Sequence, residues 1–115
     1  MGARQAPNRE GDSRQVTLRV RIADVASAEL EAAVRWYESQ RRGLGGDFLA
    51  AIIECIEQLK THPESGSLAT ADTDVRRVLL KRFPYQVVYR LREQELQILA
   101  FAHLKRRPAF WKGRA

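Results

Sequence analysis

The sequence has almost none of the residues that build disulfide frameworks or metal clusters. It contains one cysteine, Cys55, and two histidines in 115 residues, which excludes an internal disulfide and a cysteine–histidine zinc cluster. No apolar run approaches the ~20 residues that span a bilayer, so a membrane helix is also excluded. The first 15 residues are polar and lack the apolar stretch of a secretory signal. We therefore expect a protein of the reducing cytoplasm.

The chain does contain enough apolar sequence for one domain. Hydrophobic residues make up 44% and charged residues 30% of it, and a chain of this length buries roughly two-thirds of its unfolded surface on folding. Residues 1–15 contain Gly, Pro, Asn, Asp and Ser with almost nothing apolar, which predicts a flexible N-terminal tail. Residues 16–115 are expected to form a single domain.

Positive charge is concentrated in the second part of the chain. Residues 1–74 contain 9 Lys or Arg against 12 Asp or Glu, whereas residues 75–115 contain 11 against 2. The net charges of these two parts are therefore −3 and +9. A basic region of this density suggests a polyanionic partner, either a nucleic acid or an acidic protein segment, although a solvated basic surface gives the same pattern.

The first part of the expected domain has the pattern of a strand followed by a helix. Residues 16–22 alternate apolar and polar side chains, which is typical of a half-buried strand. From Ala26 to about Gln40 the apolar residues recur with helical spacing. Asp24 or Ser27 is the expected N-cap of this helix.

A second helix is expected after a glycine-rich break at residues 41–46. Asp47 is its expected cap, and its apolar residues keep helical spacing to about Lys60. Pro63 prevents continuation of the helix, and residues 63–74 are expected to be a polar loop. The two helices should therefore form an αα-hairpin.

Three β-rich runs follow, at residues 75–80, 86–91 and 95–102. Their short links predict an antiparallel meander. The expected order is β-α-α-β-β-β in an α+β domain, with the helical hairpin packed on one face of a small, mostly antiparallel sheet. The first strand should join this sheet beside the later ones. The other face is expected to be partly open, with basic side chains near it.

Short motifs along the chain are similar in order and spacing to those of the RelE/ParE superfamily of toxins from type II toxin–antitoxin modules. In chain order they are Trp36-Tyr37, Gly43-Leu44-Gly45 with Phe48, Leu59 with Pro63, Arg76-Arg77, Phe83-Pro84-Tyr85, Val87-Val88-Tyr89-Arg90, Ala102-His103, and Arg106-Arg107-Pro108 with Trp111. The resemblance covers about residues 16–112. These motifs are most similar to those of the ParE-like, plasmid-stabilisation branch.

The resemblance implies a bacterial toxin that arrests growth when free. A labile antitoxin, encoded beside the toxin, would wrap around it and hold it inactive in a hetero-oligomer. ParE-like members bind and inhibit DNA gyrase and show no nuclease chemistry, whereas RelE-like members cleave mRNA in the ribosomal A site. The resemblance implies no metal and no cofactor. A non-toxic partner-binding module is the third hypothesis.

Cleavage of RNA would need a general base, a general acid and cations that stabilise the phosphorane. The resemblance to RelE-like nucleases gives as candidates Arg77, Arg82, His103 and Arg106. Two positions depart from the nuclease pattern: Gln86 stands where an arginine is usual, and Trp111 where several nucleases carry a tyrosine. An amide supplies no charge and an indole only donates a hydrogen bond, so these departures favour the gyrase hypothesis. An alternative role for His103 is to brace the C-terminal segment by hydrogen bonding.

Binding is predicted on the basic side chains and on two tryptophans. The candidates for contact with the target or with phosphate are Arg77, Lys81, Arg82, Arg90, Lys105, Arg106, Arg107 and Trp111. The candidates for contact with the antitoxin are Trp36, Arg77, Arg82 and Arg90. Alternatively, the Trp111 ring packs on the sheet as core, Trp36 packs on the flank of its helix, and the arginines are solvated. Cys55 is expected to be an inert small hydrophobe.

Overall fold

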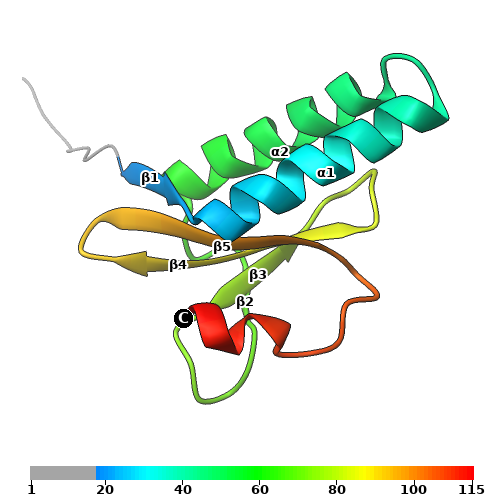
Figure 1. Cartoon of the computed structure of the whole chain (residues 1–115). Coiled ribbons are helices and arrows are strands. Elements are labelled where there is room, and N and C mark those ends of the chain that lie inside the picture. Colours follow the sequence, from blue (N-terminus) through cyan, green and yellow to red (C-terminus); the bar gives the residue numbers. More distant parts are fainter. Residues whose placement is uncertain (1–17) are drawn as a thin grey trace, which may run out of the picture.

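The computed structural model describes residues 18–115, which form a helical hairpin packed over a sheet (Figure 1). In chain order the elements are β1 (Arg19–Ile22), α1 (Asp24–Gln40), α2 (Leu44–Thr61), β2 (Ser67–Leu68), β3 (Arg76–Leu79), β4 (Tyr85–Arg92), β5 (Glu95–His103) and the 3-10 helix η2 (Phe110–Arg114). The predicted tail at residues 1–15 and the first two residues of the predicted strand at 16–22 lie outside the described residues.

Within residues 18–115 the sheet has five strands in the order β1-β5-β4-β3-β2. β1 runs parallel to β5 and the other neighbours are antiparallel, which confirms the mostly antiparallel sheet and the meander of β3, β4 and β5. The expectation of a loop throughout residues 63–74 was wrong at β2, whose two residues pair with Arg77 and Arg76. Two residues carry no alternating pattern, so β2 arises from pairing with β3 and leaves no signal in the sequence.

α1 begins earlier than its apolar spacing indicated. Asp24 is its first helical residue and Ala23 its N-cap, with no side-chain cap, so the prediction that Asp24 or Ser27 caps the helix was wrong. The Ala23 N–H donates a hydrogen bond to the Ile98 carbonyl at 3.0 Å. This bond holds the chain to β5 up to the residue before the helix, so the N-cap position falls on Ala23, whose methyl side chain cannot cap.

α2 also begins before its predicted cap, at Leu44 instead of Asp47. Its N-cap is Gly43, whose φ of 89° lies in the left-handed region that glycine adopts without strain. The Glu38 carboxylate of α1 accepts hydrogen bonds from the N–H groups of Gly43, at 2.9 Å, and Gly45, at 3.0 Å. A side chain of the first helix therefore caps the second, and the predicted αα-hairpin is confirmed.

The larger apolar core lies between the hairpin and the sheet. Tyr37, predicted on the apolar stripe of the first helix, is buried there. Its ring packs against Phe48 and Phe83 with centroids 4.9 and 5.1 Å apart. Tyr89 crosses this core and donates its hydroxyl hydrogen to the Pro63 carbonyl oxygen at 2.8 Å. These contacts fix the hairpin on one face of the sheet.

The opposite face of the sheet, which we call the outer face, carries a second and smaller core. Residues 104–115, the C-terminal segment, fold back over this face on the side away from the hairpin (Figure 1). The buried residues of this core are Val75, Val88, Leu99, Ala100 and Trp111. The C-terminal segment covers only part of this face and leaves Arg77 exposed, which agrees with the expected partly open face and its basic side chains. In the described part of the chain no helix is long and apolar enough to cross a membrane.

Candidate functional site

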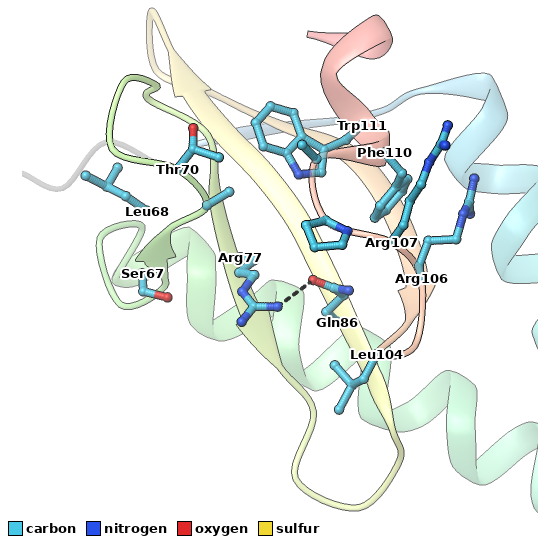
Figure 2. Close-up of a pocket in the computed structure, with 13 residues that line it drawn as sticks. Ser67, Leu68, Thr70, Arg77, Gln86, Leu104, Arg106, Arg107, Phe110 and Trp111 are labelled. Carbon is cyan, nitrogen blue, oxygen red and sulfur yellow. Dashed lines mark hydrogen bonds between the residues drawn. The ribbon is translucent and has the colours of Figure 1, made fainter.

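A groove of about 290 Å³ lies on the outer face, between the strands β3 and β4 and the C-terminal segment (Figure 2). Its lining residues are Ser67, Leu68, Ala69, Thr70, Arg77, Gln86, Leu104, Arg106, Arg107, Pro108, Ala109, Phe110 and Trp111. Of these lining residues, all from the described part of the chain, three are arginines and none is acidic. This outer groove is therefore positively charged and suits an anionic group.

Gln86 lies at the floor of the outer groove and is only 4% exposed. Its amide oxygen accepts a hydrogen bond from the Arg77 guanidinium at 3.3 Å, and its amide nitrogen lies 3.5 Å from the His103 carbonyl oxygen. Both distances are longer than the usual 2.9–3.0 Å. A buried amide with two long hydrogen bonds has donor capacity left for a ligand.

The aromatic side chains beside the groove are already engaged. Trp111 is 4% exposed and its ring belongs to the second core, which confirms the interpretation of this ring as core. The Arg106 guanidinium lies 4.3 Å from the centre of the Phe110 ring, and that of Arg114 lies 5.3 Å from it. Burial of Trp111 and the two guanidinium groups near Phe110 therefore limit stacking of a nucleic-acid base on these rings.

The C-terminal wall of the groove is held to α1 by Glu29. This carboxylate accepts two hydrogen bonds from the Arg114 guanidinium, at 2.9 and 3.0 Å. A third comes from Arg106 at 3.4 Å and a fourth from the Phe101 N–H at 3.2 Å. The sequence analysis did not identify this pair. The available signal was an acidic residue at position 29, on the same helical face as Ala26 and Ala33.

The four nuclease candidates do not converge on one place. Arg77 and Arg106 line the outer groove, whereas His103 and Arg82 do not. His103 pairs with Tyr85, which packs against the hairpin-side core, and the two rings lie 5.5 Å apart. His103 therefore lies on the face of the sheet away from the groove. Its Nδ1 accepts a hydrogen bond from the Lys105 N–H at 3.0 Å, as in the bracing role considered from the sequence.

The remaining predicted binding residues lie at separate places in the basic region, residues 75–115. Lys81 and Arg82 are exposed in the turn between β3 and β4, and Lys105 is exposed just after β5. Arg90 lines a separate hollow of about 390 Å³ near β1. There it donates to the Gln97 side chain at 2.8 Å and to the Ala115 carbonyl at 3.2 Å. Only part of the predicted set, Arg77, Arg106, Arg107 and Trp111, meets at the outer groove.

Trp36 lies far from the outer groove, on α1 of the hairpin. It is 57% exposed, and its ring meets the edge of Tyr37 with centroids 5.1 Å apart. A large apolar side chain with this exposure is available to a partner.

Cys55 is buried in α2. Burial, and secondarily the charge of Glu54, raises the pKa of its thiol to about 11. The buried thiol agrees with the expected inert role, because the thiolate is the reactive form.

The described residues contain no group of three His, Cys, Asp or Glu side chains that could hold a metal ion.

Comparisons with known proteins identify the family. The sequence matches the family model of the ParE toxin of type II toxin-antitoxin system, parDE, over residues 20–108. A search of curated proteins gives no match. Among solved structures, a chain of the chromosomal ParDE TA system from P. aeruginosa is similar, with a TM-score of 0.66 and 20% identity. The match covers 76% of this chain and 96% of that one, which shows a shared fold. The chain therefore belongs to the ParE toxin family of type II toxin–antitoxin systems.

Proposed function

We propose that this ParE-family toxin acts in the cytoplasm by binding and inhibiting DNA gyrase, and that it arrests growth when its antitoxin is absent. The observation that carries this proposal is the separation of His103 from the arginines of the outer groove by the sheet itself. A general acid or base must lie within hydrogen-bond reach of the proton it transfers. An arginine groove with a buried glutamine, and with no histidine among its described lining residues, supports binding instead of RNA cleavage.

An antitoxin is the partner that membership of this family supports. We propose that it covers two surfaces, the exposed Trp36 of the hairpin and the basic side chains Arg77, Arg82 and Arg90. Trp36 supplies a large apolar anchor of the kind that dominates stable interfaces. The arginines supply charge complementarity to an acidic segment. Replacing Trp36 by alanine should weaken antitoxin binding at least tenfold without lowering the thermal stability of the toxin, since most of the ring is exposed.

The order in which cellular syntheses stop tests the target. DNA and protein synthesis are pulse-labelled within minutes of inducing this chain alone, and again with its antitoxin. The proposal expects DNA synthesis to stop first, purified toxin to inhibit gyrase supercoiling, and the antitoxin to abolish both effects. If translation stops first, the ribosome is the target and the gyrase proposal is wrong. If growth continues without the antitoxin, the chain is a non-toxic binding module.

The nuclease hypothesis has a direct test in His103 and Arg82. If the chain cleaves RNA through them, replacing both by alanine abolishes growth arrest while leaving antitoxin binding nearly intact. Our proposal expects the His103→Ala variant to remain toxic, because its ring lies on the hairpin side of the sheet.

A further inference from the structure

We infer that the outer groove is the site where a carboxylate-bearing peptide segment of the target protein docks, with Gln86 and Arg77 as its anchor. This inference rests on the proposed function, since it names the chemistry by which the toxin recognises its target. The groove would take an acidic side chain together with a neighbouring aliphatic side chain.

Charge complementarity is the first argument. Arg77 and Arg107 line the groove, are exposed, and form no ion pair with any acidic group among residues 18–115. The third arginine, Arg106, forms an ion pair with Glu29 at 3.4 Å. Within residues 18–115 these two guanidinium groups have no counter-charge and the groove lining has no acidic residue, which favours an anionic occupant.

Gln86 supplies the second argument. Its amide is buried, and its hydrogen bonds of 3.3 and 3.5 Å are long. Figure 2 shows the Arg77 guanidinium and the Gln86 amide side by side in the groove, joined by one of these bonds. A carboxylate has two oxygens that can accept from both groups at once. Charge-assisted hydrogen bonds of this kind are short and about twice as strong as neutral ones.

The occupant is a peptide in preference to a nucleic acid because of what surrounds this anchor. Proteins that hold single-stranded nucleic acid stack bases on exposed aromatic rings. Here Trp111 is buried and Phe110 is covered by Arg106. The rim instead offers the exposed aliphatic side chains of Leu68 and Leu104, which suit an aliphatic neighbour of the acidic residue.

The size and polarity of the groove favour the target over the antitoxin as the source of this segment. Permanent complexes use large apolar interfaces, whereas transient ones use smaller and more polar surfaces. The hairpin exposes apolar side chains at Trp36, Leu49 and Ile53, while the groove encloses only about 290 Å³ and is rich in arginine. An antitoxin anchored on the hairpin that also covers Arg77 would then exclude the target from the groove.

The groove chemistry is tested on the full chain by NMR. The side-chain amide signal of Gln86 is followed while a capped hexapeptide of alternating Glu and Leu is added. Parallel titrations use the same peptide with Gln in place of Glu, and oligodeoxythymidine. We expect a saturable shift with the acidic peptide, no shift with its neutral counterpart, and about tenfold weaker binding to Arg77→Gln. A matched control, Arg42→Gln, removes the same charge from the exposed turn between α1 and α2 and should bind as the wild type does.

Two NMR results overturn the inference. If oligodeoxythymidine binds at Gln86 more tightly than the acidic peptide, the groove is a nucleic-acid site. If the acidic peptide leaves the Gln86 signal unmoved, the groove does not recognise carboxylates.

Inhibition of gyrase separates this inference from the proposed function. A wild-type chain that leaves supercoiling intact contradicts the proposed function. If the wild type inhibits, Arg77→Gln and Arg107→Gln should each need about tenfold more protein for the same inhibition, and Arg42→Gln should not. Groove variants as inhibitory as the wild type would contradict the docking site alone.

Discussion

The carboxylate of Glu29 gives the sharpest test of how the outer groove is built. It joins α1 to the C-terminal wall through Arg114, with N–O distances of 2.9 and 3.0 Å. The two side chains are only 18% and 17% exposed, so water screens their attraction little. Glu29→Gln keeps the shape and an oxygen for the Phe101 N–H, but removes the charge. Since hydrogen bonds to charged groups contribute about 1.5–3 kcal/mol, we expect a loss of roughly 2 kcal/mol in the free energy of unfolding.

This loss corresponds to a fall of about 10 °C in Tm for a domain of this size. Urea unfolding of Glu29→Gln, Arg114→Gln and the double variant measures the pair directly as a double-mutant cycle. Residues in direct contact couple, whereas independent sites add within about 0.5 kcal/mol. We expect a coupling energy of about 1–2 kcal/mol. Additive effects of the two single variants would refute the reasoning, because Glu29 would then not hold the C-terminal wall through Arg114.

Three further predictions concern the helices and a surface ion pair. A Cβ added at Gly45 would lie 2.6 Å from a carbonyl oxygen of α1, so Gly45→Ala should lower the free energy of unfolding by about 1–3 kcal/mol. A Cβ added at Gly46 meets nothing within 4 Å, so Gly46→Ala should raise the free energy of unfolding by up to ~1 kcal/mol. Thermal unfolding of both variants distinguishes these two outcomes. The Cys55 thiol, with its pKa of about 11, should resist alkylation at pH 8 until the chain is unfolded, and rapid labelling of native protein would contradict this. The hydrogen bond from Arg92 lowers the pKa of Asp74, so the pair stabilises above the unfolded value of about 3.9 and this contribution is lost as pH falls through the lower folded pKa. Asp74→Asn should therefore flatten the wild-type decline in stability below about pH 4, and an unchanged decline would be the contrary result.

Local patterns predicted the elements that carry many apolar residues. Both helices follow from spacing on one face, as at Tyr37 in α1 and Phe48 in α2. The strands β3 to β5 follow from β-rich runs between short links. The same logic misplaced the helix starts, because both starts depend on contacts with other elements of the fold. Glu38 caps α2 from the preceding helix, and the bond from Ala23 to β5 sets the start of α1.

The candidate site was only partly predictable because it depends on contacts between distant segments. The charge count indicated that residues 75–115 are basic, and three arginines of this region, Arg77, Arg106 and Arg107, line the groove. The link between Glu29 and Arg114 joins positions 85 residues apart, and no local pattern encodes it. The C-terminal segment covers part of the outer face because Trp111 is buried there. From the sequence, Trp111 could be a binding residue or part of the core.

Strand register decides which chemistry the outer face can carry. Residues paired across an antiparallel ladder project to the same face, and neighbours along a strand project to opposite faces. Tyr85 pairs with His103, and Gln86 pairs with Ala102. The residue that β4 contributes to the groove lining is therefore Gln86, whose side chain is an amide. His103 is one residue along the chain from Ala102, yet that single step puts its imidazole on the hairpin side. No rotation of its side chain brings it through the sheet to Arg77. A change of register or a new histidine on the outer face would be needed to combine a proton carrier with these arginines.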